Sequence, residues 1–446
     1  MTEPSLWHAQ YAVLDGRVER DVLIETARRL ISSVTPGQRP PPPRAQRLAG
    51  LVIPGLANAH SHAFHRALRG RAQRAGGDFW SWRALMYQVA ERLNPETYRD
   101  LARAVYAEMA LAGITAVGEF HYLHHDRGGR PYSNPNAMAE SLITAAGEAG
   151  IRLTLLDTCY LRGGFGRPLE GPQLRFGDAD AEAWAVRASA VPPADHVRRA
   201  AAIHSVRAVD EPGMKLVRDW AAERGAPLHV HVSEQPAEND QCRATTGRSP
   251  VELLADHGVL GAKTTAVHAT HLAPDDIALL GGSGASVCLC PTTERDLADG
   301  VGPASSLAAA GARLCLGSDS HAVIDLFEEA RAVELDERLT GGRRGIHRPE
   351  ALLRAATAHG MAALGFQAGA IAVDQQADLV AVDLDSPRLA GADSDDLLPS
   401  AVFAATAADV TAVVASGRLI VRDRRHLLID DVPRQLTAAI EAVMGR

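Results

Sequence analysis

Two histidines at alternating positions, His60 and His62, end a short apolar run and could bind one metal ion. On a β-strand, residues i and i+2 point to the same side, so the two imidazoles would face a common point. His231 and Asp319 each end a later apolar run and could complete the ligand set. Three histidines and one aspartate that leave a position open for water are typical of a catalytic metal site. Their nitrogen and oxygen donors favour Zn²⁺, with Fe²⁺ or Mn²⁺ as alternatives.

Two of these assignments have alternatives. His229 lies two residues before His231 on the same strand face, so spacing alone allows either ring to bind metal. We favour His231 because it is nearer the end of the run and because Glu234 follows it by three residues. A His-x-His pair can also be two ordinary polar loop residues, but here it follows a strand and a turn-like Pro-Gly pair.

The run 200–206 contains no lysine that could bridge two metals, so the sequence predicts a single metal ion.

His268 and Glu234 are candidates for the chemistry rather than for metal binding. His268 ends the sixth apolar run, and the metal has enough ligands without it. Its ring could therefore hydrogen-bond to the attacking oxygen. Glu234 would lie beside the attacking water without binding the metal, and could move a proton.

The composition is that of a globular protein. The chain has 446 residues, 46% apolar and 22% charged, with a net charge of −8 and both signs scattered along it. These values do not favour a nucleic-acid-binding protein. No segment approaches the roughly 20 apolar residues that span a bilayer, and residues 1–8 lack an export signal. Most of the five cysteines lie within apolar runs, which predicts buried free thiols in a reduced, cytoplasmic enzyme.

Short apolar runs alternate with longer amphipathic stretches between residue 51 and about residue 366. The runs lie near residues 51–59, 115–121, 152–160, 200–206, 227–233, 264–269, 286–290 and 313–318. Helical periodicity is clearest in residues 95–112, 135–149, 211–224, 274–280 and 325–339. Eight such strand-helix units predict a (β/α)8 barrel, in which active sites lie at the C-terminal ends of the strands. Every candidate ligand ends such a run, which supports a single site.

The two flanks of this alternation carry short strand-like segments. They are residues 11–14 and 21–24 on one side, and 377–382 and 410–417 on the other. We expect the flanks to pair into one small β-sandwich domain. The expected organisation is residues 1–53 as the first part of this domain, 54–366 as the barrel, 367–430 as the second part of the domain, and 431–446 as a C-terminal helix.

Several longer segments resemble formimidoylglutamate deiminases, in the deaminase branch of the amidohydrolase superfamily. They are residues 58–67, 79–87, 119–126, 204–209, 231–235 and 317–321, and the resemblance extends over nearly the whole chain. The strings FWSWR, EFHYLHHD and HSVRAV are specific, whereas a His-x-His pair alone is not. The resemblance implies an amidohydrolase-type barrel and a homodimer. It also implies a zinc-dependent hydrolysis of N-formimidoyl-L-glutamate to N-formyl-L-glutamate and ammonia, in histidine degradation.

The resemblance further implies which residues meet the substrate. Those that would bind it are Arg83, Tyr122, His204 and Arg207. The substrate carries two carboxylates and one amidine, and a guanidinium binds a carboxylate through paired hydrogen bonds; a surface ion pair is the alternative for each arginine. Glu234 and Asp319 would move protons from water to the departing nitrogen, and His268 would stabilise the tetrahedral species.

One position departs from the family pattern. This chain has His65 where the family usually has glutamine, so we expect a changed contact with the substrate. We expect His65 to border the substrate at the pocket mouth. Its ring could also gain a proton at about pH 6.5, the usual value for histidine.

Two other functions remain open from the sequence. The main alternative is a deaminase or hydrolase of the same superfamily that acts on another small amidine or on a heterocycle. Such a substrate would not need two carboxylate-binding arginines. A metal-binding protein that has lost catalysis is the other alternative, and the presence of Glu234, His268 and Asp319 disfavours it.

Overall fold

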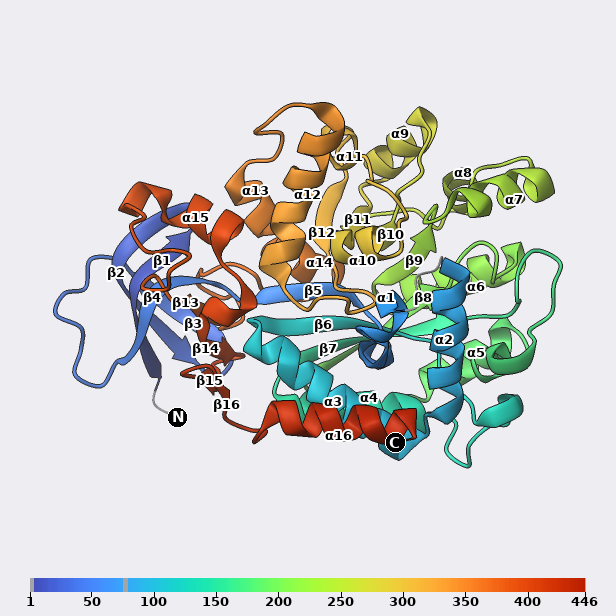
Figure 1. The fold of residues 1–446 in the computed structure, drawn as a ribbon, viewed down its shortest axis with the longest axis horizontal. Coiled ribbons are helices and arrows are strands. Elements are labelled where there is room, and N and C mark those ends of the chain that lie inside the picture. The colour runs from blue at the N-terminus through green and yellow to red at the C-terminus, as the bar shows by residue number, and fades with distance from the viewer. Residues whose placement is uncertain (1–3, 75–78, 446) are drawn as a thin grey trace.

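Eight parallel strands form a barrel that contains most of the chain (Figure 1). The computed structural model describes residues 4–74 and 79–445; of the FWSWR string, the side chains of Phe79 and Trp80 lie outside the described part. The barrel strands are β5 (Leu56–Ser61), β6 (Ile114–His121), β7 (Arg152–Cys159), β8 (Val197–Ile203), β9 (Leu228–Val232), β10 (Thr264–His268), β11 (Ser286–Leu289) and β12 (Arg313–Leu316). They lie side by side in chain order, and a bridge between Ser61 and Asp319 joins the two ends of the sheet. The predicted (β/α)8 barrel is confirmed.

Helices surround the barrel and lie over its ends (Figure 1). They are α1 (Arg71–Arg74), α2 (Phe79–Arg92), α3 (Pro95–Leu111), α4 (Ala137–Ala149), α5 (Ala181–Ser189), α6 (Glu211–Glu223), α7 (Pro236–Thr246), α8 (Pro250–Asp256), α9 (Pro274–Ser283), α10 (Pro291–Asp296), α11 (Ala304–Ala309), α12 (Leu326–Gly341), α13 (Pro349–Arg354), α14 (Gly360–Ala363), α15 (Leu397–Ala404) and α16 (Val432–Met444). Asn94 caps the start of α3, because its side chain accepts the Thr97 N–H at 2.9 Å. Within the described residues, no helix is both long and apolar enough to cross a membrane.

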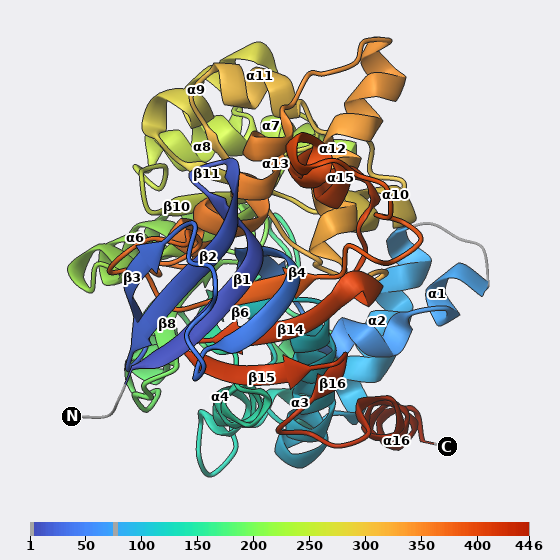
Figure 2. The ribbon, with the colours of Figure 1, turned by 90° about the vertical axis from the view of Figure 1, so that its left-hand side faces the viewer.

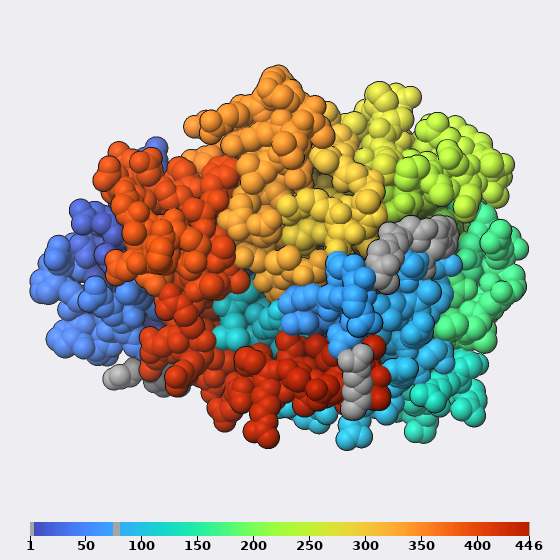
Figure 3. Space-filling model, viewed as in Figure 1, coloured from blue at the N-terminus to red at the C-terminus, as the bar shows by residue number. Residues whose placement is uncertain are grey.

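The flanks of the chain form one mixed sheet of eight strands. Its strands are β1 (Ser5–Leu14), β2 (Arg17–Ala27), β3 (Leu30–Thr35), β4 (Gln46–Pro54), β13 (Leu379–Val382), β14 (Val410–Ala415), β15 (Arg418–Arg422) and β16 (Arg425–His426). Strand β13 from the second flank pairs antiparallel with β4 from the first. Figures 2 and 3 show these blue and red segments side by side at one end of the molecule. The prediction that both flanks build one small β-domain is confirmed.

The first apolar run is divided between the two sheets, whereas the sequence suggested one barrel strand at 51–59. Strand β4 ends at Pro54 in the small sheet, and β5 begins at Leu56 in the barrel. Gly55 makes the crossing: its N–H donates to the Asp378 carbonyl at 3.0 Å, and a Cβ atom there would lie 2.4 Å from Thr115 Oγ1. Only glycine fits without displacement, and we propose that the domain boundary lies next to it, at residues 53 and 54.

A buried ion pair holds the barrel against the small sheet. Arg152, at the start of β7, donates from Nη1 to Asp378 Oδ1 at 2.9 Å and to Ser416 Oγ at 2.9 Å. Both charged residues are buried. Loss of one partner would leave an unpaired buried charge, at a cost of about 3–5 kcal/mol. The pair therefore fixes where the two parts meet.

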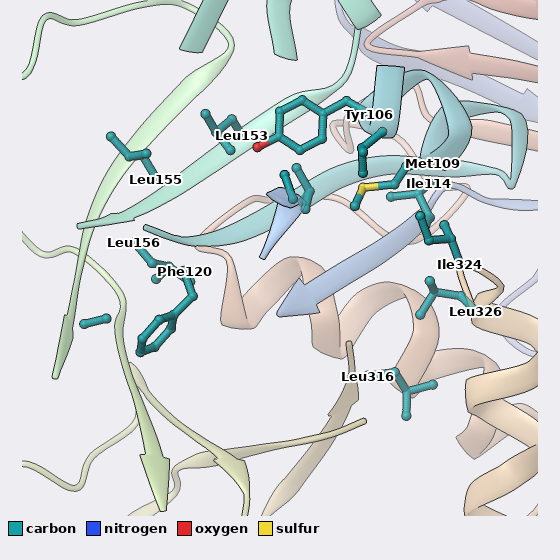
Figure 4. Close-up of a cluster of buried hydrophobic side chains, with 14 of the residues drawn as sticks. Tyr106, Met109, Ile114, Phe120, Leu153, Leu155, Leu156, Leu316, Ile324 and Leu326 are labelled. Carbon is teal, nitrogen blue, oxygen red and sulfur yellow. The ribbon is translucent and has the colours of Figure 1, made fainter. Parts of the chain in front are cut away.

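An apolar cluster beneath the barrel mouth supports the residues above it. Figure 4 shows Phe120 of β6 and Leu156 of β7 among buried side chains that include Tyr106 and Met109 of α3. Burial of side chains of this size stabilises a fold by about 1.5–3 kcal/mol each. The carbonyl of Phe120 in turn accepts a hydrogen bond from His62, so the core and the candidate site share a strand.

Candidate active site

Four side chains from three strand ends converge at the C-terminal end of the barrel. His60 lies in β5 and His62 just after it, His231 lies in β9, and Asp319 follows β12. One ligand atom of each lies within 4.8 Å of those of the other three, and all four residues are buried. The Nε2 atoms of His60 and His231 are 3.0 Å apart, and Asp319 Oδ1 lies 3.2 Å from His60 Nε2 and 3.3 Å from His62 Nε2. The structure therefore brings the four candidate metal ligands together.

The hydrogen bonds of these rings fit a bound cation. His62 donates from Nδ1 to the Phe120 carbonyl at 3.1 Å, and His231 donates from Nδ1 to the His204 carbonyl at 3.0 Å. A neutral imidazole has one N–H, so both Nε2 atoms present lone pairs to the cluster. His60 Nδ1 is buried and has no hydrogen-bond partner among the described residues. Ring nitrogens facing each other at this distance need a shared proton or a metal ion between them.

The protonation states also suit a metal. Burial lowers the pKa of His60, and lowers the pKa of His62 and His231 well below 6.5. Burial alone would raise the pKa of Asp319, but its contact with His60 lowers that pKa instead. Neutral imidazoles and an ionised carboxylate are the forms that coordinate a metal.

His229, the alternative ligand, lies deeper in the barrel. Its Nε2 atom is 3.1 Å from the Ala363 carbonyl, and it is not part of the cluster. Both rings point to the same face of β9, but two residues of strand separate them by about 6.6 Å. The position of His231 at the strand end therefore decides which ring meets the cluster.

The backbone at the strand ends takes conformations that place these side chains. Ser233, His268 and Asp319 have positive φ angles of 52°, 67° and 39°. Such conformations cost about 1–3 kcal/mol each for residues with a Cβ atom and collect at functional sites. At Asp319 the surrounding hydrogen bonds hold the turn, since its N–H donates to the His60 carbonyl at 3.0 Å and its carbonyl accepts the His62 N–H at 3.2 Å.

Glu234 and His268 face each other beside the cluster. His268 Nε2 lies 3.8 Å from Glu234 Oε1. Burial raises the pKa of the Glu234 carboxyl. Burial alone would lower the pKa of His268, but the charges of Glu234 and Glu294 raise it to about 10. The two shifts are linked, because the charge of an ionised Glu234 is what raises the pKa of His268, so the pair retains one proton that it could exchange with water or a substrate.

A second group of potential ligands, His268, Cys290 and Glu294, also lies within 4.8 Å. Glu294 Oε1 already accepts the Cys290 N–H at 2.9 Å and lies 3.5 Å from His268 Nδ1. These contacts indicate that Glu294 supports the His268 ring. A carboxylate beside one ring nitrogen fixes the direction in which the other ring nitrogen points. All five cysteines are free and buried, as predicted.

A pocket opens next to the cluster. It is lined by ten of the eleven candidate site residues: His62, His65, Arg83, Tyr122, His204, Arg207, His231, Glu234, His268 and Asp319. His60 is the exception, because its ring is fully buried behind the others.

The arginines lie on the side of the pocket that α2 and the β8–α6 connection build. Arg83 is on α2, and its guanidinium carbon is 5.4 Å from the centre of the Tyr87 ring. Arg207 follows β8, and its Nε atom is 3.9 Å from Glu238 Oε1. The His204 ring lies between this side and the cluster, 5.2 Å from the ring of His231.

His65 lines the pocket, but its surroundings correct one expectation. The side chain is buried, and His65 Nε2 lies 2.9 Å from the Tyr122 hydroxyl. Burial lowers the pKa of His65 to about 3. The prediction that its ring gains a proton near pH 6.5 is therefore wrong, because a buried imidazole cannot be solvated as a cation.

Several pocket residues were not identified from the sequence. Trp82, Met86, Tyr87, Tyr160, Phe176 and Leu297 also line the pocket. Tyr160 directly follows β7, so the strand-end rule could have found it. Phe176 lies in the long connection after β7, where no periodic pattern marks a pocket residue.

Comparison with known proteins agrees with this geometry. A family model described as "Amidohydrolase family" matches residues 51–420. The chain is 40% identical to a formimidoylglutamate deiminase of Pseudomonas aeruginosa, over 86% of this chain and 87% of that one. It is 32% identical to a 5-methylthioadenosine/S-adenosylhomocysteine deaminase of Halobacterium salinarum, over 98% and 95% of the two chains. The crystal structure of an amidohydrolase from Brucella melitensis superposes with a TM-score of 0.91 at 34% identity, covering 99% of this chain and all of that one.

Proposed function

Because the chain belongs to the amidohydrolase family, we propose that it catalyses the zinc-dependent hydrolysis of N-formimidoyl-L-glutamate to N-formyl-L-glutamate and ammonia. The observation that carries this proposal is one pocket that combines a ligand cluster, a proton-transfer pair and two guanidinium groups. The identity with a formimidoylglutamate deiminase supports the same substrate and a place in histidine degradation. By resemblance we also expect a homodimer.

Each proposed role follows from a position in the pocket or in the ligand cluster beside it. His60, His62, His231 and Asp319 would hold Zn²⁺, which lowers the pKa of water and so supplies hydroxide at neutral pH. Glu234, with Asp319, would take a proton as the water oxygen attacks the amidine carbon and deliver it to the departing nitrogen. The C–N bond then breaks, ammonia leaves, and the oxygen remains as the formyl carbonyl. His268 would donate a hydrogen bond to this oxygen while it carries negative charge.

The two arginines favour a dicarboxylate over a nucleoside. A guanidinium offers only hydrogen-bond donors, and a carboxylate offers only acceptors. Arg83 and Arg207 both line the pocket, and N-formimidoyl-L-glutamate has one carboxylate for each. A purine requires neither group. The proposal is tested by adding N-formimidoyl-L-glutamate to the purified protein and measuring both ammonia and N-formyl-L-glutamate.

We expect Arg83→Lys and Arg207→Lys each to raise KM for N-formimidoyl-L-glutamate by about 10- to 100-fold, which corresponds to one or two lost charged hydrogen bonds. Lysine keeps the positive charge but cannot form the paired contact. Steady-state kinetics measures the change, and the effect should shrink on an analogue that lacks the matching carboxylate. Arg162→Lys is the control, since Arg162 pairs with Asp210 outside the pocket. Normal KM values in both pocket variants would make these arginines structural.

We expect His65→Gln to change KM and the ranking of amidine substrates while leaving the metal content unchanged. Glutamine can keep a hydrogen bond to Tyr122, but it presents its donor and acceptor at other positions than the imidazole does. Kinetics on several N-formimidoyl amino acids, with metal analysis of the same samples, measures both effects. If neither KM nor the ranking changes, His65 is not in contact with the substrate.

A further inference from the structure

Three polar residues outside the candidate set meet on the arginine side of the pocket. Tyr87 comes from α2, Tyr160 follows β7, and Gln173 lies in a short 3₁₀ helix, Gly171–Arg175, of the connection between β7 and α5. Tyr160 and Gln173 are each 7% exposed. Both tyrosines line the pocket, while Gln173 lies behind them. None of the roles proposed above involves these residues.

Gln173 holds both hydroxyl groups in one orientation. Its Nε2 atom lies 3.1 Å from the Tyr87 hydroxyl and 3.3 Å from the Tyr160 hydroxyl. Its Oε1 atom accepts the Glu170 N–H at 3.3 Å. A backbone N–H can only donate, so this contact fixes which end of the amide is the oxygen. The amide therefore donates one hydrogen to each phenol oxygen.

Both hydroxyl groups are left as donors. Each oxygen accepts from Gln173, and within residues 4–74 and 79–445 neither hydroxyl hydrogen has a protein acceptor. Burial raises the pKa of Tyr160 to about 12, although the nearby Arg207 and Arg83 oppose this, so the hydroxyl keeps its hydrogen at neutral pH. The Tyr160 side chain is buried, and a buried donor without an acceptor is costly unless a ligand supplies one, whereas Tyr87 is half-buried.

The neighbours of these hydroxyls restrict the ligand that could accept from them. The Arg83 guanidinium lies over the Tyr87 ring, and the Tyr160 ring is 4.2 Å from the ring of His204. Two guanidinium groups and two hydroxyl hydrogens offer donors only. A group with acceptors only and a negative charge satisfies all of them, and a carboxylate is such a group.

We propose that Tyr87 and Tyr160 donate hydrogen bonds to a substrate carboxylate bound by Arg83 or Arg207, and that Gln173 is the positioning residue that orients both hydroxyls. This inference rests on the proposed function, because it requires a substrate with a carboxylate. It extends carboxylate recognition from the two arginines to a neutral pair of donors. The site would thus select a carboxylate by the direction of the hydrogen bonds that it accepts as well as by its charge.

The test uses Tyr87→Phe and Tyr160→Phe in the full-length protein, with N-formimidoyl-L-glutamate as substrate. Each variant removes one oxygen and keeps the ring. We expect each to raise KM by about 10-fold, with kcat within about 3-fold of the unmodified protein. The effect should shrink on N-formimidoyl-4-aminobutyrate or on N-formimidoyl-L-2-aminobutyrate, which each lack one carboxylate. Tyr132→Phe is the control, because its hydroxyl contacts Arg175 outside the pocket.

Gln173→Met tests the positioning role. Methionine has a similar length but cannot donate, so KM should rise in the otherwise unmodified protein. It should have no further effect when both tyrosines are already phenylalanine, because the groups that it orients are then absent. A purely structural role would add its effect in both backgrounds. If Gln173→Met does not fold, the two phenylalanine variants still decide the proposal.

The outcomes distinguish failure of the proposed function from failure of this inference alone. If the unmodified protein releases no ammonia from N-formimidoyl-L-glutamate, the proposed function is overturned and this inference with it. If it does, but both phenylalanine variants keep KM within about 2-fold, only the inference is overturned. An equal rise of KM on all three substrates would also contradict it, since the hydroxyls would then not act on a carboxylate.

Discussion

Glu234→Gln is expected to lower kcat by about 10²- to 10⁴-fold, the usual contribution of a general acid or base. Glutamine has nearly the same shape as glutamate, but it cannot accept a proton from water. Glu234 is 3.8 Å from His268 and lines the pocket without belonging to the ligand cluster. The variant should therefore keep its metal and still bind substrate.

The measurement for Glu234→Gln combines three readouts on one preparation: the steady-state rate of ammonia release, the metal content and the dissociation constant for N-formimidoyl-L-glutamate. A large loss of rate with the other two unchanged supports proton transfer by Glu234. A near-normal rate would show that another group moves the proton. Loss of metal together with the rate would mean that Glu234 supports the cluster.

His231→Gln is expected to abolish both tight metal binding and turnover, whereas His229→Gln should retain the metal. The two histidines lie on the same face of β9, so they form a matched pair. His231 Nε2 is 3.0 Å from His60 Nε2, while His229 Nε2 contacts the Ala363 carbonyl at 3.1 Å. Metal analysis should give one zinc per chain in the unmodified protein, and removal of zinc by a chelator should stop turnover until zinc is restored.

The paired design also tests the number of metal ions. Two metal equivalents that are both needed for activity would contradict the single site. Equal loss of metal from His229→Gln and His231→Gln would contradict the assignment of His231 as the ligand.

The barrel and the convergence of its strand ends could be predicted because they depend on local patterns. Each apolar run of strand length is followed by polar residues, and parallel strands in a barrel place all such ends on one face. His60, His231, His268 and Asp319 could therefore be grouped although they lie far apart in the sequence. The division of the first run at Gly55 could not be predicted, because residues on both sides are equally apolar. It depends on Asp378 and Thr115, which pack around the crossing.

The arginine side of the pocket depends on contacts that leave no periodic pattern. Gln173 reaches Tyr87 and Tyr160 only because the connection after β7 folds back against α2. Likewise, the neutral state of His65 follows from its burial against Tyr122 rather than from its residue type. Spacing indicates which side chains share a strand face, but not which connection covers them or how far they are removed from water.

The most direct test of the proposed substrate is the ratio of kcat/KM for ammonia release from N-formimidoyl-L-glutamate and from 5-methylthioadenosine, measured with the zinc-loaded protein. The second compound represents the nucleoside deaminases to which the chain is also similar. With Arg83 and Arg207 in the pocket, we expect kcat/KM of about 10⁴ M⁻¹s⁻¹ or more for N-formimidoyl-L-glutamate, with equal amounts of ammonia and N-formyl-L-glutamate, and negligible ammonia from the nucleoside. Preference for the nucleoside, or no ammonia from N-formimidoyl-L-glutamate, would contradict the account.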